Sequence, residues 1–386
     1  MIKKMNNEDL GKGIERLYYH NLGVKPGETV LVFTDRVSQE ENVSHDQSEK
    51  RRELLELFRL IVERAPSGVK VNEAIFDATG GHGKEPPEVL WIAAFGFEAV
   101  EKLKKEGLWN NLMSKSLGKV EVDRVKRILL DFCSVKTDVI IGMSYYSSTH
   151  TRFREFSTNL FQVRYASMPL FDHEMLSVTV TADWKKIAER TKKIASLFRD
   201  AEEVLIDTPN GTNLSLGIKD IPIHEDTGLL TEPGSFGNLP AGEVFMPPEP
   251  EAANGKLVLE FAPTWRLEKP VTLFVEKGEV IRVSGNDPYA AELEKFLERD
   301  QNYRNIAELG IGTNDRATRP DNILESEKIL GTIHIALGDN SSFGGQIRTS
   351  FHQDFVVFYP TLTILYPGDK RRDLLIRGQL KDVYED

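Results

Sequence analysis

The chain contains 386 residues and carries a net charge of −11, with 40% hydrophobic and 28% charged residues. This composition is that of a globular protein, and the acidic balance without a basic block argues against a nucleic-acid partner. A chain of this length exceeds one ordinary hydrophobic core, so we expect two domains. Its single cysteine, Cys133, excludes a disulfide scaffold and a zinc site built from thiolates.

The first residues, MIKKMNNEDLGKGIERLYYH, lack the apolar stretch of a secretory signal. No other segment is long and apolar enough to cross a bilayer. We therefore expect a cytoplasmic protein without a membrane partner.

The first half of the chain alternates strand-like and helix-like patterns. The strands are expected at 28–35, 69–78 and 137–146, and the helices at 48–65, 86–107 and 149–162. This alternation predicts an α/β domain with a largely parallel sheet.

The pattern changes near residue 185. A helix over 184–201 is followed mostly by strands, with one further helix over 291–300 and a Lys-Gly hairpin turn in FVEKGEVIRV. We predict an N-terminal α/β domain over 1–183 and a strand-rich α+β domain over 184–386.

One strand-like segment near the end, SFHQDFVVF, carries two polar residues at a spacing of two. His352 and Asp354 therefore lie on one face of the strand, because successive side chains alternate. Burying both on one face is costly unless each is satisfied. A metal ion would satisfy them, and so would a direct hydrogen bond between them.

Three more candidates lie upstream in the same part of the chain. His334, in TIHIALGD, precedes the strand of His352 by a short connection, so a hairpin would bring the two histidines together. Glu243 lies in a Gly/Pro-rich loop, and Glu308 lies among apolar residues in IAELGIGTN. For the glutamates, a salt bridge or exposure at a strand end is the alternative to a functional role.

The five residues together form a set of oxygen and nitrogen ligands without thiols. Such a set suits Zn, Co, Mn or Fe. Two bridged divalent ions held by these residues could bind a hydroxide and polarise a carbonyl group.

Several segments, in order, resemble the M29 family of metallo-aminopeptidases, the thermophilic aminopeptidase T type. The matching segments are NLPAGEVFMPPEP, NIAELGIGTN, GTIHIALGD and HQDF, with weaker matches in THTRFREF, ASMP and DTPNGTNLSL. The resemblance covers most of the chain and is clearest from about residue 140 onward.

The resemblance implies a metal-dependent aminopeptidase, a hydrolase that removes N-terminal residues from peptides and forms a homodimer. Its two divalent ions (Zn, Co or Mn) would be bound by Glu243, Glu308, His334, His352 and Asp354. Glu308 and a glutamate before His334 would take catalytic roles. Glu325 and Glu327 are both candidates for that second glutamate, and Glu327 is our assignment.

Two residues of the first domain are predicted to contact substrate. In the segment STHTR, His150 and Arg152 could meet a peptide, since an arginine can bind a carboxylate through two hydrogen bonds. Capping of the following helix by Ser148 or Thr149 is the alternative explanation of this segment.

The sequence departs from the peptidase pattern after His334. The family places a tyrosine there, where this chain has Ser341, and Phe343 lacks a hydroxyl. A phenol can stabilise the oxyanion that forms during peptide hydrolysis, so the absence of this tyrosine is a reason to consider functions other than a peptidase. A related group resembles 2,5-dihydroxypyridine dioxygenases, in which one Fe(II) would be bound by His334, His352 and Asp354. A non-catalytic metal-binding protein is the third alternative.

Overall fold

A computed structural model describes residues 7–39, 41–263 and 265–381 of the protein. The chain divides into two compact units, which are described separately below. The first consists of Met1–Thr181 with Gly228–Pro240, and the second of Ala182–Thr227 with Ala241–Asp386.

The first unit is built on a parallel sheet with the strand order β2-β1-β3-β4-β8. Its strands are Thr29–Arg36 (β1), Lys70–Asp77 (β2), Val139–Gly142 (β3), Arg164–Ser167 (β4) and Phe236–Asn238 (β8). Its α-helices are Asn7–Glu15 (α1), His45–Glu63 (α2), Glu88–Phe95 (α3), Phe97–Lys105 (α4), Trp109–Met113 (α5), Lys119–Phe132 (α6) and Arg152–Glu155 (α7), and Arg16–Asn21, Phe156–Leu160 and Met175–Thr179 form short π-helices. Seven of the eight β1 residues are buried, as expected for a central parallel strand covered on both faces.

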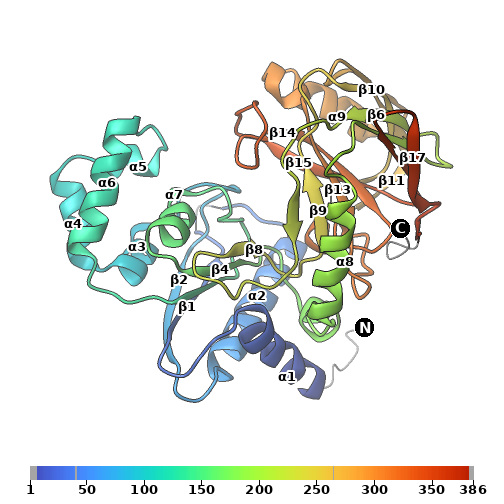
Figure 1. Cartoon of the computed structure of the whole chain (residues 1–386). Helices are drawn as coiled ribbons and strands as arrows, with labels where there is room; N and C mark the ends of the chain where they lie inside the picture. The colour runs from blue at the N-terminus through green and yellow to red at the C-terminus, as the bar shows by residue number, and fades with distance from the viewer. Residues whose placement is uncertain (1–6, 40, 264, 382–386) are drawn as a thin grey trace. The chain divides into compact units, whose positions relative to one another are not determined.

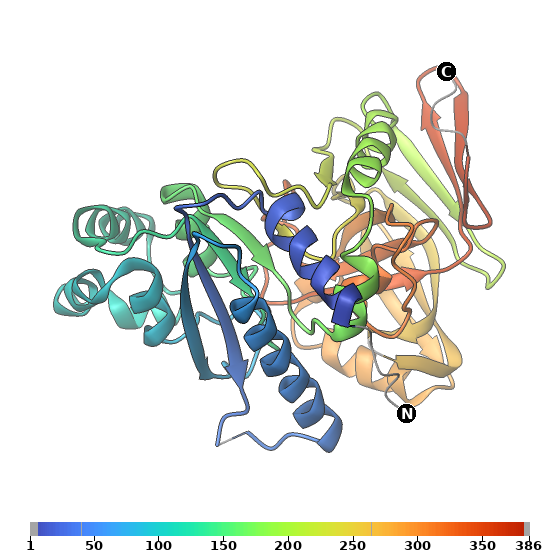
Figure 2. The same ribbon diagram turned by 90° about the horizontal axis from the view of Figure 1, so that it is seen from below.

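Helices cover this sheet through apolar side chains. Figure 2 shows α2 running alongside β1, which it contacts. Leu31 and Phe33 of β1 belong to a core that also contains Trp91 and Phe95 of α3. An aromatic edge contact joins Trp91 to Phe153 of α7. Packing of this kind contributes more to the stability of these helices than their intrinsic helix propensity does.

A carboxylate is buried at the start of α7. Glu85 is 8% exposed, and its two oxygens accept hydrogen bonds from the backbone N–H groups of Arg152 (2.6 Å) and Phe153 (3.2 Å). Burial raises the pKa of Glu85 to about 7, although both hydrogen bonds act in the opposite direction.

The segment Gly228–Pro240 returns from the second unit to the first. It does so because β8 pairs in parallel with β4 at the edge of the first sheet. The expected single boundary after residue 183 did not include this excursion.

The second unit contains two antiparallel sheets and the helices Trp184–Ser196 (α8), Pro288–Leu297 (α9) and Ile323–Ser326 (α10). One sheet has the order β12-β11-β10-β6-β5-β16-β17-β18. Its strands are Glu203–Asp207 (β5), Asn213–Gly217 (β6), Ala253–Ala262 (β10), Trp265–Glu276 (β11), Glu279–Gly285 (β12), Thr361–Tyr366 (β16), Lys370–Ile376 (β17) and Gln379–Leu380 (β18).

The other sheet of this unit carries the candidate site. It has the order β15-β14-β13-β9-β7, with strands His224–Asp226 (β7), Glu243–Met246 (β9), Ile306–Gly312 (β13), Ile333–Gly338 (β14) and His352–Val357 (β15). Helix α8 packs against β7 and β9 (Figure 1). We refer to this sheet as the site sheet.

The expected architecture, an α/β domain with a parallel sheet followed by a strand-rich α+β domain, is confirmed. The predicted hairpin is also present, since Lys277 and Gly278 join β11 to β12 with positive φ angles of 48° and 79°. In the described part of the chain, the helices are all too short or too polar to cross a bilayer.

Candidate metal centre

All five predicted ligands project from one face of the site sheet. Glu243 lies on β9, Glu308 on β13, His334 on β14, and His352 and Asp354 on β15. The register explains their common side, since Ala336 of β14 faces both Glu308 and Asp354 across the strands. Residues two apart on a strand share a face, so His334 and His352 follow from the same register.

The opposite face of the site sheet is apolar. Its side chains join the main core of the second unit, and they are Val244, Met246, Leu309, Ile311, Ile333, Ile335, Leu337, Phe355 and Val357. Core and site residues therefore alternate along each strand, and burial of the apolar face fixes the strand register that puts the polar groups on the other face.

A bulge in β13 adjusts this alternation at Ala307. Ile306 pairs with Leu337, but Glu308 pairs with Ala336, so one extra residue lies on β13. The bulge lets Ile306 face the core while Glu308 faces the site.

A glycine provides the space in which His334 lies. Gly310 is the cross-strand partner of His334, and a Cβ at residue 310 would overlap the atoms Cε1 and Nε2 of its imidazole ring. The ring thus lies directly over the backbone of β13, with its Nε2 turned toward the carboxylates.

Glu308 joins the two histidines. Its Oε1 lies 3.2 Å from Nε2 of His334, and its Oε2 lies 3.5 Å from Nε2 of His352. Oδ1 of Asp354 also lies 3.5 Å from Nε2 of His352. These residues form two overlapping sets of possible metal ligands, Glu243–Glu308–His334 and Glu308–His352–Asp354. Within each set, one ligand atom per residue lies within 4.8 Å of the other two.

The orientation of His352 is set from behind the site. Its Nδ1 lies 2.7 Å from the backbone carbonyl oxygen of Asp339. A carbonyl can only accept, so Nδ1 carries the proton and Nε2 is left to face the carboxylates. This is the hydrogen-bonding arrangement typical of a metal-binding histidine.

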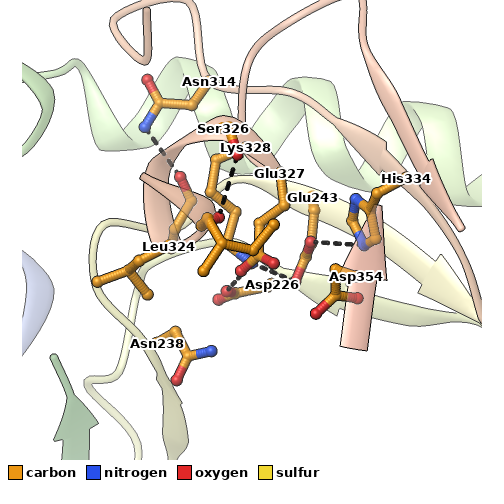
Figure 3. Close-up of polar contacts among 12 residues, drawn as sticks. Asp226, Asn238, Glu243, Asn314, Leu324, Ser326, Glu327, Lys328, His334 and Asp354 are labelled. Atoms are coloured by element: carbon orange, nitrogen blue, oxygen red, sulfur yellow. Dashed lines mark hydrogen bonds and ion pairs between the residues drawn. The ribbon is translucent and has the colours of Figure 1, made fainter. Parts of the chain in front are cut away.

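Glu243 lies between a cation and a histidine, as Figure 3 shows. Its Oε1 accepts a hydrogen bond from Nζ of Lys328 at 2.5 Å. Its Oε2 lies 3.5 Å from Nε2 of His334, and no hydrogen-bond donor among the described residues reaches this buried oxygen.

Lys328 also contacts two other carboxylates. Its Nζ lies 2.9 Å from Glu327 and 4.0 Å from Asp226 of β7. The lysine is 1% exposed. We call Asp226, Glu243, Glu327 and Lys328 the lysine cluster.

The pKa shifts reflect an excess of carboxylates in this region. Burial lowers the pKa of both histidines, but the carboxylates outweigh it: Glu308, Glu243 and Asp354 raise the pKa of His334 to about 9. Asp354 and Glu308 raise the pKa of His352 to about 10. Burial raises the pKa of Glu327 to about 8. The site thus attracts positive charge, whether protons or a metal ion.

The side chains fit a divalent metal ion. They offer imidazole nitrogens and carboxylate oxygens that converge on one space, together with a buried carboxylate oxygen of Glu243 that lacks a donor. Two histidines and a carboxylate are the ligand combination of non-haem Fe(II) oxygenases, and the same donors also suit Zn, Co and Mn.

The structure distinguishes the two candidate glutamates before His334. Glu327 belongs to the lysine cluster, whereas Oε1 of Glu325 accepts hydrogen bonds from the backbone N–H groups of Thr318 (2.8 Å) and Arg319 (3.3 Å). Glu325 therefore stabilises the loop before α10, and Glu327 is the nearer to the candidate ligands.

The two predicted substrate residues of the first unit have local contacts. Arg152 forms an ion pair with Glu155 at 2.5 Å, and the backbone carbonyl of His150 accepts a hydrogen bond from Lys115. Thr151, rather than Ser148 or Thr149, caps α7 by accepting from the N–H of Arg154. A role of His150 and Arg152 in binding substrate stays a prediction.

Sequence reasoning missed three features of the site. Lys328 and Asp226 were not recognised, although the position of Lys328 directly before the mainly apolar segment ILGTIHIALG could have indicated a buried charge. The role of Gly310 was also missed. Ser341, at the spacing of the absent tyrosine, is exposed and donates to the carboxylate of Asp339.

Comparison with known proteins identifies related chains. A family model described as 2,5-dihydroxypyridine 5,6-dioxygenase matches residues 170–365, which include all five candidate ligands. A curated 2,5-dihydroxypyridine 5,6-dioxygenase from Pseudomonas putida is 23% identical over 175 residues. That alignment covers 41% of this chain and spans only half the length of the relative.

Two solved structures share the fold. The structure of 2,5-dihydroxypyridine dioxygenase from Pseudomonas putida superposes with a TM-score of 0.64 at 17% identity, covering 98% of both chains. Wild-type AmpT from Thermus thermophilus gives a TM-score of 0.54 at 16% identity, covering 97% of this chain and 99% of that one. The expected likeness to the aminopeptidase T type is thus confirmed for the fold.

Proposed function

Because the chain belongs to the 2,5-dihydroxypyridine 5,6-dioxygenase family, we propose that it is a ring-cleaving dioxygenase that uses a single Fe(II) ion. The observation that carries this proposal is that His334, His352 and Asp354 project from one face of the site sheet, with Glu308 3.2 Å from His334 and 3.5 Å from His352. Two imidazoles and one carboxylate leave coordination positions open for substrate and dioxygen.

The prediction of a metallo-aminopeptidase, with its assignment as a hydrolase and protease, is wrong. The family model and the curated relative both name a dioxygenase. The error came from counting Glu243 and Glu308 as evidence for a second ion. In the structure, Oε1 of Glu243 accepts a hydrogen bond from Lys328, so this oxygen has a partner other than a metal ion.

The side chains of this unit account for the positioning that such a reaction needs. Asp339 holds His352 through Nδ1, and Gly310 leaves room for the ring of His334. Glu308 is the carboxylate between both rings, and in this proposal it would accept a proton from a bound hydroxyl group. A bound Fe(II) ion would supply the one-electron chemistry that permits reaction with dioxygen.

Aromatic side chains beside the centre support a planar ring as the substrate. Phe245 shares the ligand face of β9 with Glu243, and its ring stacks on His224 with centroids 5.0 Å apart. Phe343 lies edge-on to His352 at 6.0 Å and to Phe245 at 5.6 Å. Such rings favour offset or edge contacts with a further aromatic ring. We therefore propose a dihydroxypyridine as the substrate in place of a peptide.

Oxygen uptake tests the proposal. The protein is reconstituted with Fe(II) without oxygen, and uptake is then followed on addition of 2,5-dihydroxypyridine together with the loss of the substrate's ultraviolet absorbance. The His352→Ala variant is the control, and aminoacyl amides are tested in parallel. Iron-loaded protein that consumes no oxygen with dihydroxypyridines would contradict the proposed reaction. The homodimer implied by the resemblance stays a prediction, which light scattering tests.

A further inference from the structure

The lysine cluster places one positive charge among three buried carboxylates, of which Glu243 is also a candidate metal ligand. Nζ of Lys328 lies within 2.5 Å of Glu243, 2.9 Å of Glu327 and 4.0 Å of Asp226 (Figure 3). The side chains of all three carboxylates are at most 11% exposed. Water therefore contributes little to their stabilisation, and a nearby cation must do so.

The strand pairing brings two of these carboxylates together. Asp226 of β7 is the direct cross-strand partner of Glu243 on β9. Like charges at such positions destabilise a sheet, because their side chains lie on one face at short distance. The ammonium group of Lys328 offsets this repulsion.

The backbone fixes Lys328 at this position. The N–H of Asn314 donates to the carbonyl of Lys328 at 2.9 Å, and the N–H of Leu330 donates to the carbonyl of Asn314 at 3.0 Å. At Gly312, a Cβ would overlap the carbonyl group of Ile329, so this glycine allows the close approach. Lys328 is thus held in place and differs from a mobile surface lysine.

We infer that Lys328 is a positioning residue that replaces a second metal ion in this centre. Its ammonium group holds Oε1 of Glu243 and leaves Oε2 turned toward His334. One metal ion then remains to be bound at the two histidines. This inference rests on the proposed function and extends it, since it names the residue that would limit the centre to one ion.

Metal content per chain is the direct test. Wild-type protein and the variants Lys328→Met and Lys328→Arg are loaded with Co(II), desalted and measured by mass spectrometry and visible absorption. We expect one ion in the wild type and in Lys328→Arg, and two in Lys328→Met, with a changed Co(II) spectrum. Arg190→Met is the matched control, because Arg190 is a partly buried cation that contacts Thr313 and Asp315 instead of the candidate ligands. It should bind one ion.

Two results would overturn the inference: two ions in the wild type, or one ion in folded Lys328→Met. If Lys328→Met fails to fold, the double variant with Glu327→Gln removes one charge of each sign, and two ions are again expected. The outcome is separable from the proposed reaction. Wild-type protein that binds one ion but consumes no oxygen would contradict the dioxygenase alone, whereas an active enzyme with unchanged ion content in Lys328→Met would contradict the role of Lys328 alone.

Discussion

Replacing Gly310 by alanine should disturb the metal centre without touching a ligand. Gly310 is paired with His334, and a new Cβ would overlap the imidazole at the edge that carries Nε2. Ordinary contact between heavy atoms requires about 3.5–4.0 Å, so the ring would have to move by about 1.5 Å. His334 is 1% exposed, so its displaced ring would press against neighbouring buried atoms.

Two effects of this substitution can be estimated. Overpacking of a buried site costs about 1–3 kcal/mol of unfolding free energy. Displacement of a ligand, like the loss of a residue that orients one, should weaken metal binding by about 10- to 100-fold. We expect both effects, with the loss of metal affinity as the more specific one.

Titration with Co(II) or Fe(II) measures the affinity, and thermal unfolding of the metal-free protein measures the stability. Gly118→Ala is the control, because residue 118 has a φ of −72° and a Cβ there would meet only a carboxylate oxygen at 3.7 Å. It should bind metal normally. If Gly310→Ala binds metal within twofold of the wild type, then His334 is not a ligand or its position is not set by β13.

Three further predictions concern other residues. His352→Ala should remain folded but lose metal, since it removes a ligand atom that faces Glu308 and Asp354; full metal content by mass spectrometry would refute the assignment. Glu85→Gln should change the pH dependence of stability. Because the folded-state pKa of about 7 exceeds the ordinary pKa of 4.5 of a glutamate in the unfolded chain, the ionised carboxylate destabilises the fold, and wild-type stability should fall as pH rises from about 4.5 to about 7. The loss is about 3 kcal/mol at most and should be absent in the variant, as urea unfolding at pH 4.5 and pH 8 would reveal; parallel profiles would show that Glu85 does not titrate there. Phe245→Ala should raise KM for the dihydroxypyridine about fivefold with little change in kcat, because an aromatic contact contributes about 1 kcal/mol, and unchanged steady-state oxygen-uptake kinetics would exclude that contact.

Local patterns in the sequence were sufficient for the candidate ligands. The spacing of His352 and Asp354 placed them on one strand face, and the short connection after His334 indicated a hairpin, which β14 and β15 form. Alternation and short-range pairing depend on neighbouring residues, so they can be recognised without the fold. The alternation of strands and helices likewise indicated the two kinds of domain.

The reaction type did not follow from the same patterns. The same ligand types suit a hydrolase with two ions and an oxygenase with one ion, so the residues alone left both open. The hydrogen bond from Lys328 to Oε1 of Glu243 is the contact on which we base the proposal of one ion. No sequence motif around Lys328 predicts its hydrogen bond to Glu243, because the two residues are 85 positions apart in the sequence.

The sequence by itself determined the candidate donor atoms of the centre and the strand face from which they project, since both follow from residue identity and a period of two. Only the tertiary structure decided how these donors are shared. The bulge at Ala307, the space at Gly310 and Gly312, and the return of residues 228–240 to the first sheet are long-range packing results. Each depends on which strands become neighbours, and that is set by burial of the whole core rather than by any local segment.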